Sequence, residues 1–228
     1  MPYKVIQWAT GSMGKTCLRA TIDHPDLDLS GLLVYGKSKA GKDAGDIARR
    51  DPTGVIATRS KDDILNIDAD VVIHTPRLQP PYAHHNKDIC RLLASGKNVI
   101  SINGHSFPQY WGTEYLEEIN NACAKGNSTL FGTGLNPGFV IEKIATIATG
   151  ICTKIDNIQV TEVFETHMVP DANYVFDVLG FGSDPDTMDP NDPLWTPAEM
   201  MNGMYSESVA LLVKRLGLTL DRVQTDHE

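Results

Sequence analysis

The sequence predicts an α/β protein with a doubly wound parallel sheet, followed by an α+β domain that is incomplete in this chain. Three observations predict it. Strand-like and helix-like segments alternate from residue 3 to about residue 132. The first strand runs into a glycine turn and then a helix, and the alternation stops after Pro137. Such alternation is typical of parallel sheets covered by helices on both faces.

The first domain, residues 1–135, is expected to hold six strands and five helices. Ligands of such sheets bind beyond the carboxyl ends of the strands. Those ends carry the most unusual sequences of the chain, at 11–14, 35–39, 74–77, 101–105 and 132–138. The expected strands are 3–8, 29–35, 55–58, 70–74, 98–102 and 129–131, and the expected helices are 13–23, 43–50, 61–66, 82–95 and 115–125.

The second domain, residues 136–228, shows a different pattern. Residues 139–149 and 199–216 are expected to be helices. Residues 155–166 alternate like a strand with one buried face that carries Ile158, Val160 and Phe164. One strand has no neighbour for its backbone hydrogen bonds. We therefore expect this domain to be truncated in the chain or completed by another subunit.

Composition and charge exclude several classes of function. The net charge of −9 over 228 residues disfavours binding to nucleic acid or to an anionic membrane surface. No apolar run approaches the ~20 residues of a membrane span, and no secretory signal is visible, so a cytoplasmic protein is expected. The four cysteines lie far apart and predict free thiols. No cluster of metal ligands is present, because the adjacent His84 and His85 point to different faces of a helix.

The glycine turn after the first strand allows three interpretations. With Ala9, Gly11 and Gly14, it is a dinucleotide fingerprint in which one glycine is replaced. Gly14-Lys15-Thr16 also matches the end of a P-loop, but Ala9 stands where that motif begins with glycine. Asp70 starts its strand, whereas a P-loop enzyme needs an Asp at a strand end for magnesium. The third interpretation is a tight turn alone. The strand–helix alternation favours the dinucleotide site.

The end of the second strand bears on the choice between NAD and NADP. NAD-binding proteins usually carry Asp or Glu there for the ribose 2′-hydroxyl. The segment Tyr35-Gly-Lys-Ser-Lys39 has no carboxylate and offers two lysines and a hydroxyl. These groups suit a 2′-phosphate. NADP is therefore favoured, with NAD possible and a solvated basic loop as the alternative.

Three segments together resemble the dihydrodipicolinate reductase-like superfamily. They are the glycine turn, Ala40-Gly-Lys-Asp-Ala-Gly-Asp-Ile-Ala48 and Thr133-Gly-Leu-Asn-Pro-Gly-Phe139. Within the superfamily the chain is most similar to the group of 2,4-diaminopentanoate dehydrogenases and native amine dehydrogenases. The resemblance implies an N-terminal Rossmann domain, NAD(P)H as cofactor, a small-molecule substrate and a homodimer or homotetramer. Members of the group are typically longer than this chain.

The resemblance also implies roles for matching residues. The cofactor pyrophosphate would lie at the turn, the adenosine ribose at the second strand end, and the nicotinamide beyond the fourth and fifth expected strands. Asn136 and Pro137 would mark the crossing to the second domain, near the nicotinamide amide. The complete set of expected cofactor-binding residues is Thr10, Gly11, Ser12, Met13, Gly14, Tyr35, Lys37, Ser38, Lys39, His74, Thr75, Pro76, Ser101, Ile102, Asn103, Asn136 and Pro137.

Two departures from the family pattern concern the substrate. The His-His pair and the Lys-x-Asp-x-Pro-Ser-Gly-Thr run of dihydrodipicolinate reductases are missing, which argues against lysine biosynthesis. The acidic residue that amine-forming members carry after the fifth expected strand is also missing, and His105 falls near that place. His105 is the leading candidate for the catalytic proton donor, because imidazole titrates in the right range. The alternative is a loop histidine that hydrogen-bonds to the backbone.

Three further residues are expected near the substrate. Glu165 and His167 would share the polar face of the 155–166 strand, although a solvent-facing pair fits them equally well. Tyr174 would wall an apolar pocket unless it belongs to the core. The predicted function is an NAD(P)H-dependent oxidoreductase that moves a hydride to or from a small carbonyl, imine or amine. The alternatives are a catalytically silent NAD(P)-binding sensor and a P-loop nucleotidase.

Overall fold

The structure is a computed structural model in which residues 1–79, 81–163, 165–169, 171–184, 186, 189 and 196–226 are described. The chain divides into two compact units. Unit 1 contains Met1–Arg77, His85–His105 and Trp111–Gly132. Unit 2 contains Thr133–Glu228 together with two short loops of the N-terminal region, Leu78–His84 and Ser106–Tyr110.

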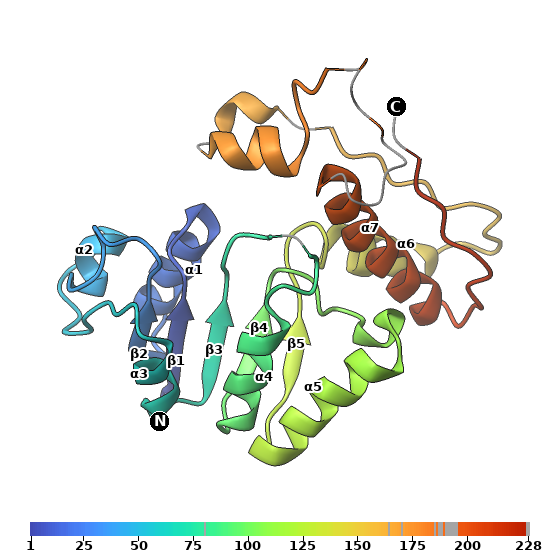
Figure 1. Ribbon diagram of the computed structural model, residues 1–228. Helices are drawn as coiled ribbons and strands as arrows, with labels where there is room; N and C mark the ends of the chain where they lie inside the picture. The colour runs from blue at the N-terminus through green and yellow to red at the C-terminus, as the bar shows by residue number, and fades with distance from the viewer. Residues whose placement is uncertain are drawn as a thin grey trace. The chain divides into compact units, whose positions relative to one another are not determined.

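Unit 1 is built on a five-stranded parallel sheet in the order β2-β1-β3-β4-β5. Figure 1 shows the strands running in one direction, with α4 and α5 packed against each other. The register pairs Trp8 with His74 and His74 with Ser101, so three strand ends lie in one row. The predicted doubly wound α/β fold is confirmed. The strands are β1 (Tyr3–Trp8), β2 (Leu27–Leu33), β3 (Val71–His74), β4 (Asn98–Ser101) and β5 (Leu130–Gly132).

The prediction of a strand at 55–58 is wrong. Its residues make only two isolated bridges, Leu33 to Thr58 and Asp43 to Ile56. The N–H groups of Gly41 and Ala44 donate to carbonyls of this segment, which ties it to the preceding loop. The Asp43 carboxylate caps α2 and also accepts the N–H groups of Thr53 and Gly54. This local folding replaces continuous pairing with the sheet.

Two apolar cores hold the helices of unit 1 to the sheet. Ile64 from α3, Leu92 and Leu93 from α4, and Ile119 from α5 meet apolar strand residues in the larger core. Leu18 from α1 and Ala48 from α2 belong to the second core. The helix expected at 82–95 begins only at Asn86, because residues 81–85 form a turn. The helices are α1 (Ser12–Asp23), α2 (Ala44–Ala48), α3 (Lys61–Asn66), α4 (Asn86–Ala94) and α5 (Thr113–Gly126).

The described part of unit 2 consists of helical segments and irregular chain. The helix expected at 139–149 divides into η2 (Val140–Ala145), a π-helix, and α6 (Thr146–Thr149). The N–H of Ile144 donates to the carbonyl of Phe139, the wide spacing of a π-turn. The long helix expected at 199–216 is confirmed as α7 (Thr196–Arg215). Shorter turns are η1 (Pro108–Trp111), η3 (Thr166–Met168) and the π-helix η4 (Tyr174–Val178).

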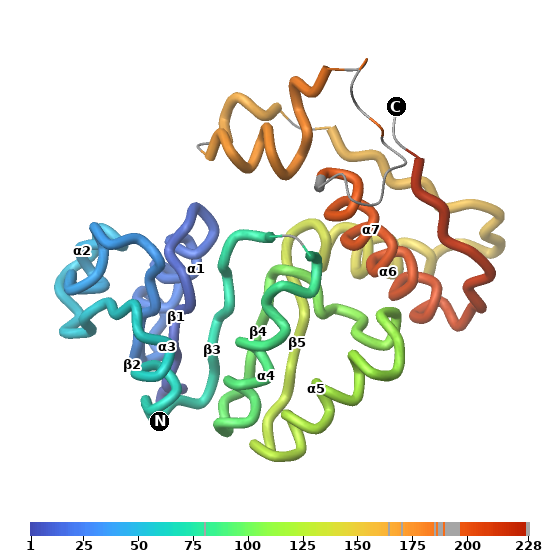
Figure 2. The backbone as a smooth tube through the Cα atoms, in the orientation of Figure 1, coloured from blue at the N-terminus to red at the C-terminus, as the bar shows by residue number. Residues whose placement is uncertain are grey.

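The prediction of a strand at 155–166 is also wrong. Residues 155–163 follow an irregular path that Figure 2 traces as a smooth tube, and residues 166–168 form η3. Val160 and Val163 are exposed, and Phe164 lies outside the described residues. The reason is the missing neighbour, since no strand is assigned in the described part of unit 2. An alternating sequence without a partner strand gains no ladder hydrogen bonds.

Candidate functional site

The glycine turn joins the end of β1 to the start of α1. Gly11 caps the helix in an extended conformation. A Cβ atom on Gly14 would lie 2.4 Å from the Ala9 carbonyl oxygen and 2.7 Å from Thr75 Oγ1. A Cβ atom on Gly11 would meet no atom within 4 Å. Gly14 therefore permits close packing of helix and strand, while Gly11 leaves open space at the start of α1, where free N–H groups attract an anion.

Ala9 occupies the position of the replaced fingerprint glycine, and its backbone shows why glycine suits that position. Its φ is 77°, in the left-handed region that most side chains avoid. Side chains of β1 and of the segment after β3 donate hydrogen bonds to the carbonyls of Trp8 and Ala9. Gln7 Nε2 donates to the Ala9 carbonyl at 2.9 Å, and Thr75 Oγ1 donates to the Trp8 carbonyl at 3.0 Å. Thr75 thus supports the turn, and its expected contact with the cofactor stays a prediction.

The side chain of Lys39 contacts the glycine turn at Thr10. Its Nζ donates to the Thr10 carbonyl at 2.6 Å and to Thr10 Oγ1 at 3.0 Å. Partial burial lowers the pKa of Lys39, and the nearby charge of Lys15 acts in the same direction. Two cations therefore lie near the start of α1. Lys37 and Ser38 are exposed in the turn that follows β2.

The end of β2 carries an arginine that the sequence does not predict there. Tyr35 lies just beyond β2, and its hydroxyl accepts a hydrogen bond from Trp8 Nε1 at 3.0 Å. Arg59 Nε donates to the Tyr35 carbonyl at 3.0 Å. The bridge between Leu33 and Thr58 brings Arg59 to this place. The only sequence signal is a basic residue after an expected strand whose pairing the sequence does not specify.

The ends of β3 and β4 are tied together by Asn103. Its side-chain amide donates to the Pro76 carbonyl, and its N–H donates to Ser101 Oγ at 3.3 Å. The N–H of Ile102 donates to the His74 carbonyl at 3.2 Å. The expected cofactor-binding residues of these two strand ends therefore lie together in unit 1.

Buried imidazoles surround the same strand ends. The His74 ring lies 5.7 Å from the Trp8 ring and 5.3 Å from the His85 ring, between centroids. Burial lowers the pKa of His74 well below its usual range, and the charges that His85, His105 and Lys61 can carry act in the same direction. His85 Nε2 is held by the Arg77 carbonyl at 2.8 Å.

His105 is only 4% exposed and has φ of 65°. Its ring stacks on Tyr115 at 6.1 Å between centroids, and neither ring nitrogen has a hydrogen-bond partner among the described residues. Burial, with a smaller contribution from His85, lowers its pKa to about 4, while the Asn103 and Gly104 backbone acts in the opposite direction. The ring is therefore neutral at neutral pH. That His105 donates a proton stays a prediction, and a neutral ring still offers one N–H and one acceptor.

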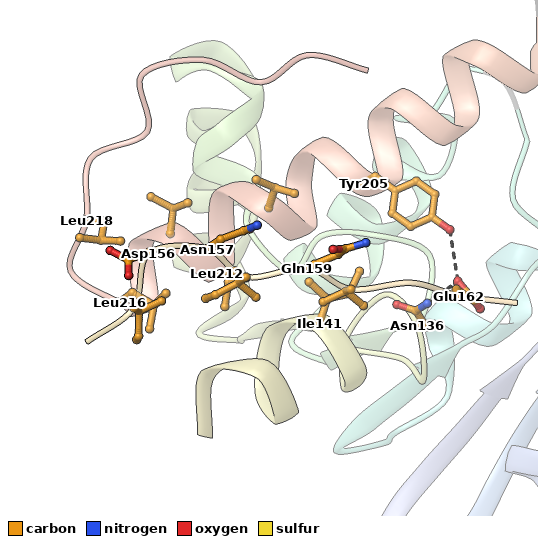
Figure 3. A pocket seen from close by; sticks show the side chains of 15 residues that line it. Asn136, Ile141, Asp156, Asn157, Gln159, Glu162, Tyr205, Leu212, Leu216 and Leu218 are labelled. Atoms are coloured by element: carbon orange, nitrogen blue, oxygen red, sulfur yellow. Dashed lines mark hydrogen bonds between the residues drawn. The ribbon is translucent and has the colours of Figure 1, made fainter. Parts of the chain in front are cut away.

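Unit 2 contains a largely apolar groove of about 840 Å³. Figure 3 shows Asn136, Glu162 and Tyr205 together at one end of it. The Asn136 amide donates to the Glu162 carboxylate, and the Tyr205 hydroxyl donates to the same carboxylate at 3.2 Å. Burial, assisted by Glu162, raises the pKa of Tyr205 to about 12. Apolar walls come from α7, η2 and the irregular segment, with Ile141, Ile158, Val160, Val209, Leu212 and Leu216 among them.

The expected substrate residues do not gather at this groove. His167 Nδ1 pairs with Glu165 Oε1 at 2.7 Å, and both side chains are exposed. Neither residue lines the groove, and a contact of this pair with substrate stays a prediction. Tyr174 is partly buried, and burial raises its pKa with a contribution from Glu162. Pro137 follows Asn136 at the edge of the groove through a cis peptide bond.

Three findings concern disulfides, metal clusters and membrane-spanning helices. The four cysteines are free thiols. No group of three or more potential metal ligands occurs among the described residues. No helix in the described part of the chain is long and apolar enough to cross a membrane.

The parallel sheet with its glycine turn defines a Rossmann-type fold. No protein-family profile matches the chain. It is 24% identical over 222 residues to an amine dehydrogenase from Streptomyces virginiae, covering 96% of this chain and 61% of that protein. It is 25% identical over 159 residues to a 2,4-diaminopentanoate dehydrogenase from Acetoanaerobium sticklandii, covering 68% of this chain and 44% of that protein. The chain thus spans only part of each relative's length.

A solved structure extends the comparison to the fold. The amine dehydrogenase from Mycobacterium smegmatis superposes with a TM-score of 0.60 at 17% identity, covering 68% of this chain and 46% of that chain. This superposition shows a shared fold. The two sequence relatives confirm the predicted resemblance to the group of amine dehydrogenases and 2,4-diaminopentanoate dehydrogenases.

Proposed function

We propose that the protein is an NAD(P)H-dependent oxidoreductase acting on a small carbonyl, imine or amine. The observation that carries the proposal is the glycine turn, with Gly14 packed against β1 and Gly11 facing open space at the start of α1. The names of the two curated relatives, an amine dehydrogenase and a 2,4-diaminopentanoate dehydrogenase, support the reaction class. The activity of a whole protein of this kind is part of the proposal.

The residues of unit 1 fit a dinucleotide. The N–H groups at the start of α1 would hold the pyrophosphate at Gly11, with the Lys15 and Lys39 charges nearby. The bound nicotinamide would supply or accept the hydride. The β3 and β4 ends, tied by Asn103, would hold the nicotinamide half.

His105 would face the substrate in its neutral form. Its two ring nitrogens have no partner among the described residues, so a ligand can occupy either one. An N–H hydrogen bond to the carbonyl oxygen or imine nitrogen would polarise the double bond as the hydride arrives. This role needs no spare proton on the ring.

Asp70 argues against a P-loop nucleotidase. Its carboxylate accepts the Lys4 N–H at 2.7 Å, at the start of β1. The glycine turn lies after the opposite end of that strand. Asp70 therefore does not provide a magnesium ligand at the turn.

A protein that binds the cofactor without turnover is the second candidate. Two observations favour it. No carboxylate follows β4, and the low pKa of His105 leaves its ring without a proton to give at neutral pH. A single-turnover assay with NADPH and a panel of ketones and imines separates the two candidates. Loss of the absorbance of the reduced nicotinamide in this assay would establish an enzyme.

The two glycines of the turn provide the test of cofactor binding. We expect Gly11→Ala to reduce NADPH affinity at least tenfold, because the new methyl fills the pyrophosphate approach. Its unfolding free energy should fall by no more than about 1 kcal/mol, the cost of alanine at a helix N-cap. Gly14→Ala is the packing control, and overlap with the Ala9 backbone should cost about 1–3 kcal/mol. Isothermal titration and urea unfolding measure both quantities. Failure of the unmodified chain to bind either NADPH or NADH would refute the proposed function.

We also propose that NADP is preferred over NAD, through Arg59 and Lys37. Arg59 uses Nε on the Tyr35 carbonyl, which leaves its terminal amino groups at the β2 end. Arg59→Ala should weaken NADPH binding roughly tenfold, as expected for a charge-assisted hydrogen bond. NADH binding should change less than about twofold, since NADH lacks the 2′-phosphate. Arg19→Ala is a matched control, because Arg19 Nε also donates to a backbone carbonyl, that of Ala48 at 2.8 Å. An unchanged NADPH-to-NADH affinity ratio in Arg59→Ala would contradict this assignment.

A further inference from the structure

One face of α7 receives the side chain and backbone of Tyr82. The N–H of Tyr82 donates to Glu199 Oε1 at 3.1 Å, and its hydroxyl donates to Glu207 Oε2 at 2.8 Å. Between them, a Cβ atom on Gly203 would lie 2.8 Å from the Tyr82 ring. Residues spaced by four along a helix share one face. We call Glu199, Gly203 and Glu207 the Tyr82 seat.

Glu207 connects this seat to a second loop. Its Oε1 atom accepts the N–H of Phe107 at 2.6 Å, so one carboxylate serves both Tyr82 and Phe107. Glu207 is 1% exposed, and the neighbouring Ser206 and Ser208 are also buried. A buried carboxylate is tolerated when its oxygens accept hydrogen bonds, and removing its partners leaves a costly unsatisfied charge. Glu207 therefore fixes two loops to one point of α7.

Both loops are covalent continuations of the proposed nicotinamide-binding strand ends. Residues 78–84 begin directly after 74–77, at the end of β3, and His85 follows them. Residues 106–110 begin directly after His105, beyond the end of β4. The seat thus binds residues that follow each of these two segments closely in the sequence.

We propose that the Tyr82 seat is a positioning device for the nicotinamide half of the cofactor. Glu207 and Tyr82 do not touch cofactor or substrate in this proposal; they hold the loops that follow His74–Arg77 and His105. The inference rests on the proposed function, and it makes a narrower statement. The adenosine half, held at the glycine turn and the β2 end, should not depend on the seat.

The test compares a whole cofactor with its adenosine half. Dissociation constants of NADPH and of 2′,5′-ADP are measured by titration on the full chain for Tyr82→Phe, Glu207→Gln and Glu207→Leu. Tyr82→Phe removes one hydrogen bond to a carboxylate and should weaken NADPH roughly tenfold. Glu207→Leu should weaken it more, because Phe107 and Tyr82 both lose their acceptor. Binding of 2′,5′-ADP should stay within about twofold in all three.

Glu207→Gln provides a conservative rescue. A glutamine can accept from the Phe107 N–H through its carbonyl and donate to the Tyr82 oxygen through its amide. Its NADPH affinity should therefore lie between those of the unmodified chain and Glu207→Leu. The exposed Tyr3 and Glu117 supply matched controls, Tyr3→Phe and Glu117→Leu, which should leave both ligands unchanged.

The ratio of the two affinities decides the outcome. A selective loss of NADPH binding in Tyr82→Phe and Glu207→Leu supports the seat as a positioning device. An unchanged ratio overturns it, whether both affinities hold or both fall together, since a joint fall indicates a general loss of structure. If the unmodified chain binds neither NADPH nor 2′,5′-ADP, the proposed function itself fails, and that result is distinct from an unchanged ratio.

Discussion

β1 in unit 1 and residues 155–163 in unit 2 both have sequences that favour a strand, but only β1 forms one. β1 pairs with β2 on one side and β3 on the other, and Val5 and Ile6 are completely buried. Residues 155–163 have no strand partner in the described structure, and Val163 is 91% exposed. The difference shows that apolar patterning favours a strand only where neighbouring strands take its N–H and C=O groups.

The same contrast extends through the two units. Polar side chains of unit 1 near the strand ends are tied to backbone groups, as Asn103 is to Pro76 and Lys39 is to Thr10. Unit 2 instead leaves large apolar side chains in solvent, including Ile147, Ile151, Val163, Met168 and Phe176. Unit 1 therefore meets the requirements of a folded sheet domain with its own residues, whereas the described part of unit 2 buries some apolar side chains, such as Met200 and Val178, and leaves these others exposed.

Core truncations in the two units give the largest expected difference. Leu92 is completely buried among the sheet, α4 and α5, while Ile151 is 90% exposed. Leu92→Ala should lower the unfolding free energy by about 2–5 kcal/mol, because it removes buried surface and leaves a cavity. Ile151→Ala should change it by less than about 0.5 kcal/mol.

Urea unfolding monitored by circular dichroism measures both variants. A substantial loss in Ile151→Ala would show that Ile151 is covered in solution, and the contrast between the units would then be wrong.

The sequence predicts unit 1 well because its signals are local. The Gly11 and Gly14 turn and the apolar runs of the strands depend on neighbouring residues. Arg59 shows where local signals end, because only the Leu33–Thr58 bridge brings it to the β2 end. The 55–58 segment satisfies the pattern of a strand and yet pairs mainly with its own loop.

The remaining features depend on contacts between distant residues. Tyr82 and Glu207 are separated by more than half of the chain, and neither belongs to a motif that would join them. The neutral state of His105 follows from burial, which the sequence does not give. The 155–166 prediction fails for the complementary reason, since a strand requires a partner that its own sequence does not encode.

The pH dependence of the unfolding free energy of unit 1 is expected to be a smaller effect than the truncation of Leu92. The folded-state pKa of His105 is about 4, below the value of roughly 6.5 for an unfolded histidine. The unfolded chain therefore binds more protons between these values, so stability contributed by neutral His105 is complete above pH 6.5 and is lost as pH falls towards 4. The loss should reach roughly 2–3 kcal/mol. Buried His74 acts in the same direction.

His105→Asn removes the titrating group and should flatten this part of the pH profile. Urea unfolding at several pH values between 4 and 7 measures the slope for both chains, and the NMR titration of the imidazole Cε1 proton gives the folded-state pKa directly. A His105 midpoint near 6.5, or equal slopes for the two chains, would contradict the burial of this ring. A ring that titrates near neutral pH could also carry a proton for the reduction.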